Sequence, residues 1–152
     1  MDERQLRKRE TINSFFMHIS NKIADLEKKY VKKHKISDLS SAELHLLDVV
    51  SALNFPTMGE VAHQAQLTNG TITTAVKRLE KKAYIVRVKD GVDRRLIRVQ
   101  LTHKGKKAVA VHVEFYEKLE MALSDSTIDD TRLLDAIKRI TACFDQVEER
   151  LL

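Results

Sequence analysis

The stretch from Pro56 to Gly105 constrains the fold of this chain more than any other part. It predicts a short helix, a tight turn at 65–67, a longer helix over 69–82, and two strands at 84–88 and 96–101. Thr57 and Glu60 predict a capping box at the start of the short helix, and Thr68 is the expected N-cap of the longer one. We expect Leu67 to fill the corner between the two helices.

The outward face of the helix over 69–82 carries short polar side chains first and basic side chains later. A threonine hydroxyl can donate to or accept from a base edge, and its methyl group can pack on thymine. Gly70 would let the backbone come close to DNA. The inward positions of this helix are expected to be Ile72, Ala75, Val76 and Leu79. The pattern predicts a recognition helix lying in the major groove of double-stranded DNA.

A basic loop, 89–95, joins the two predicted strands and contains the Asp90-Gly91 turn signal. Arg94 and Arg95 lie near its tip, where they could enter a minor groove. Asp93 is expected to orient a neighbouring arginine by a charge-assisted hydrogen bond. The two helices and this hairpin together predict a helix-turn-helix with a β-wing.

The net charge of +5 is unevenly spread along the 152 residues. Residues 77–107 hold twelve Lys and Arg against three acids, whereas 36–76 hold four acids and no Lys or Arg. The charge is +5 over 1–35 and −5 over 108–152. Positive charge concentrated on the end of the recognition helix and the wing favours binding to phosphates.

Long amphipathic helices are predicted on both sides of this module. Apolar residues recur at helical spacing over 5–33, and Ser40 and Glu43 predict a capping box before a helix over 41–53. Thr102 is expected to cap a helix over 103–123. A final stripe reads Leu133, Ile137, Ile140, Phe144, Val147 and Leu151. Such a stripe on a last helix needs a partner, so we expect a homodimer with a two-fold interface.

The expected fold class is therefore mainly α with a small β-wing. We expect a winged helix-turn-helix domain over 36–107 and a discontinuous helical dimerisation domain over 1–35 and 108–152. The stretch from Pro56 to Gly105 resembles the DNA-binding core of the MarR family of bacterial transcriptional regulators. Asp93-Arg94-Arg95 and Leu101-Thr102-His103-Lys104-Gly105 match the wing signature of that family.

The resemblance implies a homodimer that binds a palindromic operator, with Arg95 in the minor groove and Thr68 to Arg78 facing the major groove. It covers nearly the whole chain. Many members have glycine where this chain has Ala83, so we expect the helix to end by a different turn here. The candidate DNA-binding residues are Thr57, Thr68, Asn69, Gly70, Thr71, Thr73, Thr74, Lys77, Arg78, Lys89, Asp93, Arg94 and Arg95.

Within that family the chain is similar to the fatty-acid-biosynthesis repressors of lactic acid bacteria and relatives. The likeness rests on 40–50, on 69–74 and on Asp93-Arg94-Arg95. It implies a repressor with acylated acyl carrier protein as corepressor. The candidate lining of an acyl pocket is Phe15, Phe16, Ile19, Leu46 and Val50, although for each residue taken singly a place in the ordinary core is the better interpretation.

Other functions are less well supported by the residues. No nucleophile–base arrangement or Gly-rich phosphate loop is present, so we expect neither an enzyme nor a cofactor. No metal site is expected, because none of the six His forms a His-x-x-x-His pair and Cys143 is the single Cys. Cys143 is expected to be a buried, inert thiol.

Without a signal core or an apolar run of membrane-span length, we expect a cytoplasmic protein with no membrane contact. The alternatives are a MarR-type regulator of another small ligand, zinc or an oxidant, and a winged-helix protein-interaction module.

Overall fold

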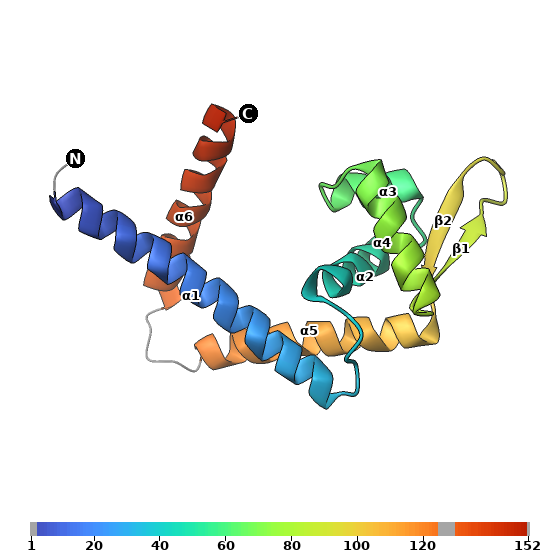
Figure 1. The fold of residues 1–152 in the computed structure, drawn as a ribbon, viewed down its shortest axis with the longest axis horizontal. Helices are drawn as coiled ribbons and strands as arrows, with labels where there is room; N and C mark the ends of the chain where they lie inside the picture. Colours follow the sequence, from blue (N-terminus) through green and yellow to red (C-terminus); the bar gives the residue numbers. More distant parts are fainter. Residues whose placement is uncertain (1–2, 125–129, 152) are drawn as a thin grey trace. The chain divides into compact units, whose positions relative to one another are not determined.

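The computed structural model describes residues 3–124 and 130–151. In chain order they form α1 (Glu3–Lys33), α2 (Ser41–Leu53), α3 (Met58–Gln64), α4 (Asn69–Lys81), β1 (Ile85–Lys89), β2 (Ile97–Leu101), α5 (His103–Ser124) and α6 (Asp130–Leu151) (Figure 1). The chain divides into two compact units, Met1–Phe115 and Tyr116–Leu152, and each is described by itself. The predicted fold class, mainly helical with a two-stranded wing, is confirmed.

Side-chain caps set where the helices of the first unit begin. Ser40 Oγ accepts from the Glu43 N–H at 3.3 Å, and Glu43 Oε2 accepts from the Ser40 N–H at 2.9 Å. Thr57 and Glu60 form the same reciprocal pair before α3, and Thr68 caps α4. All three starts were predicted correctly, because a side-chain cap depends only on residues within three positions of one another.

Four helices of this unit end on a non-glycine residue in the left-handed conformation, at Lys35, Asn54, Gln66 and Ala83. After α4, the Tyr84 N–H donates to the Leu79 carbonyl at 3.0 Å, and Ala83 has a φ of 61°. The expectation that Ala83 would impose a different turn is therefore wrong. Two backbone hydrogen bonds and the burial of Tyr84 just beyond the turn offset a strain of about 1 kcal/mol.

The core of the first unit gathers the inward faces of α2, α3 and α4 with the base of the wing. The predicted inward residues Ile72, Val76 and Leu79 are fully buried and Ala75 is half-buried. Leu67, however, is 46% exposed, so its predicted role as a corner plug is wrong. The left-handed turn before it directs the side chain outward, while its N–H closes the turn on the Ala62 carbonyl at 3.0 Å.

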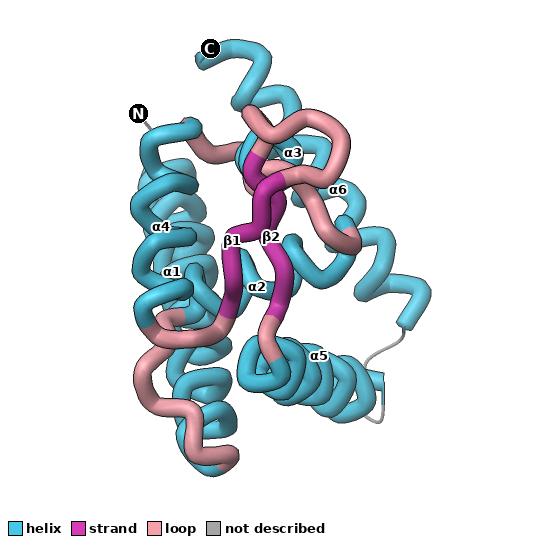
Figure 2. Tube along the Cα trace, turned by 90° about the vertical axis from the view of Figure 1, so that its right-hand side faces the viewer, coloured by secondary structure: helices cyan, strands magenta, loops and turns pink. Residues whose placement is uncertain are grey.

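Strands β1 and β2 form an antiparallel hairpin (Figure 2). Its register runs from Ile85 opposite Leu101 to Lys89 opposite Ile97. Ile85 and Val99 are buried, and the other residues of the two strands are half-buried or exposed. The wing is therefore anchored to the core at its base and projects its basic loop into solvent.

The Leu-Thr-x-x-Gly motif joins the wing to α5. Thr102 Oγ1 accepts from the Gly105 N–H at 3.0 Å and donates to the Ala83 carbonyl at 2.7 Å. A Cβ atom at position 105 would lie 2.1 Å from the Tyr84 carbonyl oxygen. Glycine is required there because the first turn of α5 packs directly on the backbone at the start of β1.

Helix α1 leaves a stripe of apolar side chains uncovered in the single chain. Ile12, Phe15 and Ile19 are between 43% and 53% exposed. A stripe of this kind is expected to be covered by a partner. The described helices include none with the length and apolar character that a membrane crossing requires.

The second unit contains the end of α5 and the whole of α6. Its apolar surface includes Leu134 and Ile137, which are 55% and 49% exposed. Of the predicted seam, the side chains of Leu133, Phe144, Val147 and Leu151 lie outside the described residues. Cys143 is exposed, so the expected burial of this thiol is wrong for the single chain.

Candidate nucleic-acid interface

Helix α4 presents its predicted polar face to solvent. Its N-terminal turns expose Asn69, Gly70, Thr71, Thr73 and Thr74, and Lys77 and Arg78 follow on the same exposed side. A Cβ atom at Gly70 would meet nothing closer than the Thr68 hydroxyl at 4.0 Å. Packing within the protein therefore does not require glycine at 70.

The threonine side chains on this face are held by their own helix. Thr73 Oγ1 donates to the Asn69 carbonyl at 2.7 Å, and Thr74 Oγ1 donates to the Gly70 carbonyl at 3.0 Å. The Thr71 hydroxyl lies 2.9 Å from that of the capping Thr68. These bonds fix the rotamers, so the methyl groups and the acceptor lone pairs are presented in set positions.

The wing loop presents an arginine in a preset geometry. Arg95 donates from Nε and Nη2 to the Asp93 carboxylate at 3.1 and 3.2 Å, although its side chain is 90% exposed. The hydrogen bond from Arg95 lowers the pKa of Asp93, so the pair stays charged at neutral pH. This arrangement is the one expected from the sequence, with Asp93 orienting the arginine. Arg94 and Lys89 are also exposed.

The base of the wing is fixed by a pair that sequence reasoning missed. Arg98 of β2 donates from Nε to Asp90, and from Nη1 to the Phe55 carbonyl at 2.9 Å. The Arg98 hydrogen bond, with the N–H groups of Asp93 and Val92, lowers the pKa of Asp90 to about 2. The guanidinium also lies 5.4 Å from the centre of the Phe55 ring.

Arg98 therefore joins the wing to the turn that follows α2. Thr57, the cap of α3, also makes an isolated antiparallel bridge to Arg98, which brings the start of α3 against the wing. Thr57 is half-buried in this position. The only sequence signal for this pair was Asp90 in a turn, eight residues before an arginine on the return strand.

A second network ties the recognition unit to the end of α1. Asp38, in the loop after α1, accepts from the Tyr84 hydroxyl at 2.6 Å and from Lys104 Nζ at 3.4 Å. Lys82 Nζ donates to the Asp38 carbonyl and lies 2.8 Å from Glu43 Oε1. Burial, followed by the hydrogen bond to Asp38, raises the pKa of Tyr84.

Part of the basic charge over 77–107 is thus used inside the protein. The described ion pairs from this stretch to acids outside the wing tip are Lys82–Glu43, Arg87–Glu80, Arg98–Asp90, Arg98–Glu60 and Lys104–Asp38. No ion pair is described for Lys77, Arg78, Lys89 or Arg94 in the described part of the chain. These four and Arg95 are the cations best placed to meet phosphates or a groove.

The residues suggested for an acyl pocket do not share one environment. Leu46 and Val50 belong to the buried core, Phe16 is half-buried, and Phe15 and Ile19 are exposed. A cavity of about 820 Å³ lies elsewhere in the first unit, beside the end of α1, the following loop and the start of α2. Its lining includes Val31, Ile36 and Leu44, and none of the five suggested residues.

Comparison with known proteins places the chain among winged-helix proteins. The family described as "Winged helix DNA-binding domain" matches residues 42–119. The HTH-type transcriptional regulator SarZ of Staphylococcus aureus is 34% identical over 95 residues, covering 60% of this chain and 61% of SarZ. The chain thus aligns with less than two thirds of the length of this curated relative.

Two solved structures are similar over most of their length. Streptococcus pneumoniae FabT in complex with DNA has a TM-score of 0.81 and 27% identity, covering 93% of this chain and 98% of FabT. The S. aureus MepR–DNA complex has a TM-score of 0.71 and 22% identity, covering 90% and 97%, and shows the shared fold.

The matched family covers half of the chain, and it includes the caps, the recognition helix and the wing described above. It is a DNA-binding class without enzymatic activity, which confirms the expectation that the chain is not an enzyme. The wing signature and the order of the helices agree with the MarR type that was predicted from the sequence. The chain therefore belongs to the winged-helix DNA-binding domain family, as a member of the MarR type.

Proposed function

We propose that this protein is a homodimeric, sequence-specific transcriptional repressor that binds a palindromic operator in double-stranded DNA. Helix α4 would lie in the major groove, and Arg95 of the wing would enter the adjacent minor groove. The observation that carries this proposal is the exposed face of α4, with its threonine rotamers fixed by bonds to Asn69 and Gly70. A surface that bound its partner through positive charge alone would not require this row of fixed threonine side chains.

The dimer would use the uncovered apolar stripes of α1 and of the second unit. In this proposal, 1–35 and 108–152 form the dimerisation domain, and 36–107 form the DNA-binding domain. Two recognition helices related by a two-fold axis would meet half-sites about 10 bp apart. Each chain of the dimer would then make the same contacts from α4 and the wing, one set in each half of a palindromic operator.

For the effector, we propose acylated acyl carrier protein as a corepressor at fatty-acid-biosynthesis genes, in the cytoplasm. Support comes from the likeness to FabT, at 27% identity over 93% of the chain. The acyl pocket proposed at Phe15, Phe16, Ile19, Leu46 and Val50 would need the dimer, because two of these side chains are exposed in the single chain. The cavity beside Val31 and Leu44 is a second possible place for the chain.

The substitution Thr73→Ala tests whether the exposed face of α4 contacts the bases of the operator. Loss of a base contact should weaken binding to the operator at least about fivefold, with little effect on random DNA. Thr11→Ala is the matched control, because Thr11 also donates to the carbonyl four residues earlier, at 2.8 Å, on the exposed surface of α1. Fluorescence anisotropy of labelled duplexes measures both. An equal loss in the two variants, or none in either, would show that α4 does not read the operator.

The effector is tested by the same titration with and without long-chain acylated carrier protein. The proposal expects tighter operator binding with the acylated carrier and no change with the unacylated carrier. Equal operator binding in all three conditions would remove the lipid corepressor and leave the DNA-binding proposal standing.

A further inference from the structure

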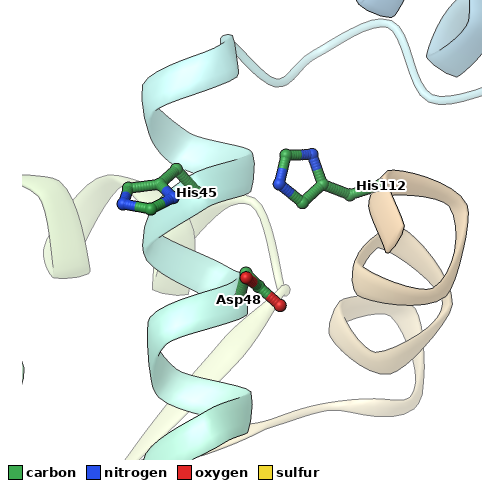
Figure 3. A group of neighbouring side chains, drawn as sticks. All are labelled: His45, Asp48 and His112. Atoms are coloured by element: carbon green, nitrogen blue, oxygen red, sulfur yellow. The ribbon is translucent and has the colours of Figure 1, made fainter. Parts of the chain in front are cut away.

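Four ionisable side chains from three helices meet inside the first unit, away from the DNA-binding surface. His45 and Asp48 come from α2, and His112 comes from α5 (Figure 3). One ligand atom of each lies within 4.8 Å of those of the other two. Glu27 of α1 stands behind His112, with its Oε1 atom 2.8 Å from His112 Nδ1.

The four side chains of this cluster differ in burial, from the interior of the unit to its surface. Glu27 and His112 are 2% and 6% exposed, Asp48 is half-buried, and His45 is exposed. Burying ionisable groups in a small core is costly unless each is paired or holds an ion. The proposed contacts with DNA use none of the four. The exposed His45 leaves one side of the cluster open to solvent, which a metal ion needs for entry.

We propose that His45, Asp48 and His112 form a binding site for a divalent transition metal, with zinc as the best-suited ion. Two imidazoles and one carboxylate are the ligands of many three-ligand zinc sites, where a water molecule takes the fourth position. Imidazole ligands also disfavour Mg²⁺ and Ca²⁺, which prefer oxygen ligands. This proposal departs from the expectation of no metal site that was drawn from the sequence.

Glu27 is the positioning residue of the site. Glu27 Oε1 and His112 Nδ1 lie 2.8 Å apart but make no hydrogen bond with each other in the single chain. With the metal bound, the Nδ1–H group would turn to donate to this carboxylate, which would leave Nε2 of His112 as the coordinating atom. Bond lengths near 2.0–2.2 Å place zinc ligand atoms roughly 3.4 Å apart, so ligand atoms that now lie within 4.8 Å of one another need to approach by up to about 1.4 Å. His45 and Asp48 are three residues apart on one helix face, so rotamer changes are enough to do this.

A metal ion here would join α2 to α5. The turn after α2 contains Phe55, whose carbonyl accepts from Arg98 at the base of the wing. Metal binding would therefore steady the helix that positions the wing, and metal would change DNA affinity. This consequence, unlike the site itself, rests on the proposed DNA-binding function.

The site is tested on the full-length, chelator-treated protein with Zn²⁺ in competition with a chromophoric chelator, and with Co²⁺ as a spectroscopic probe. We expect one equivalent to bind, with visible d–d absorption from nitrogen and oxygen ligands. His45→Gln and Asp48→Asn should each weaken binding more than about 100-fold, and Glu27→Gln about 10–100-fold. Because His45 is exposed and Asp48 is half-buried, these two variants should keep the fold.

His103→Gln is the matched control, since His103 is an exposed histidine at the start of α5. The proposal is overturned if Zn²⁺ does not bind, or if His45→Gln and Asp48→Asn bind it as the wild type does. It is also overturned if His103→Gln weakens binding equally.

DNA affinity with Zn²⁺ and with chelator then separates the two proposals. We expect a difference in the wild type that His45→Gln abolishes. No difference would overturn the coupling, and no operator binding in either condition would overturn the DNA-binding function. Both of these outcomes leave the Co²⁺ spectrum as the independent test of the site.

Discussion

At the scale of single residues, Arg95 is the side chain whose exposure and orientation point most directly to DNA. Its guanidinium is held by Asp93 and is 90% exposed on its side chain. Arg95→Ala should weaken DNA binding and reduce the slope of log affinity against log salt by about 0.9, the value of one lost phosphate-type contact. Anisotropy titrations at several salt concentrations measure this slope.

Lys29→Ala is the control for charge alone. Lys29 is also an exposed cation paired with a nearby acid, Asp25, at 2.6 Å. Its loss should leave the salt slope unchanged. If both variants change the slope equally, the net charge of the protein, rather than the wing, determines the affinity.

Ala83 gives a prediction about stability. Its φ of 61° is a conformation in which glycine has no Cβ strain, and its side chain is exposed, so Ala83→Gly loses no packing. We expect a gain of roughly 0.5–1 kcal/mol in the free energy of unfolding. Ala65→Gly, at the end of α3 with a φ of −80°, should instead lose about 0.5–1 kcal/mol. Urea denaturation would contradict this account if both variants shifted in the same direction.

At the scale of elements, the sequence was sufficient wherever a structure depends on neighbouring residues. Caps at Ser40, Thr57 and Thr68 and the buried stripe of α4 were all predicted correctly. The prediction for Leu67 was wrong, because a left-handed turn at Gln66 sets the direction of the Leu67 side chain. Glutamine in the sequence gives no signal for such a turn. The candidate DNA-binding residues are exposed or half-buried, but their contacts with DNA stay predictions.

Contacts between distant residues could not be predicted in this way. The Arg98–Asp90 pair depends on the register of the hairpin, and the Tyr84–Asp38 bond joins residues 46 positions apart. The cluster of His45, Asp48 and His112 was missed because a search for close histidine pairs cannot see ligands from two packed helices.

The wing base gives a prediction about pH. Asp90 has its pKa lowered from 3.8 to about 2 by Arg98, so its folded form favours the charged state. The stabilisation is present above the unfolded pKa, and it is lost as the pH falls through the folded value near 2. NMR titration of the Asp90 carboxyl carbon should give a midpoint near 2 in the wild type, and one closer to 3.8 in Arg98→Ala.

Arg87→Ala is the control for this titration, because Arg87 of β1 pairs with Glu80 instead. The Asp90 midpoint should stay near 2 in that variant. A wild-type midpoint near 3.8 would mean that Arg98 does not hold Asp90 in solution.

The junction of the wing with α5 gives a second test at this scale. Gly105→Ala would place a methyl group 2.1 Å from the Tyr84 carbonyl oxygen, so the helix must move. We expect a loss of at least about 2 kcal/mol in the free energy of unfolding. Gly59→Ala, in an exposed position of α3 with nothing within 4 Å, should gain up to about 1 kcal/mol. Equal stability of the two variants in urea would show that the packing at 105 is not tight.

At the scale of the whole molecule, the apolar stripes and the recognition surface point to one assembly. Ile12, Phe15 and Ile19 on α1, and Leu134 and Ile137 on α6, are exposed in the single chain. We expect two chains to cover these side chains in a dimer. Sedimentation equilibrium should then give a dimer without DNA. A monomer at micromolar concentration would contradict the two-fold symmetric assembly that a palindromic operator requires.

The central claim is tested most directly by one comparison of affinities at physiological salt. The purified protein is titrated onto a palindrome from its own promoter region and onto a scrambled duplex of the same composition. We expect binding to the palindrome at least about 10³-fold tighter than to the scrambled duplex, with two chains per site. Equal affinity for the two duplexes would contradict it and favour a module whose basic wing binds acidic partners without reading a sequence.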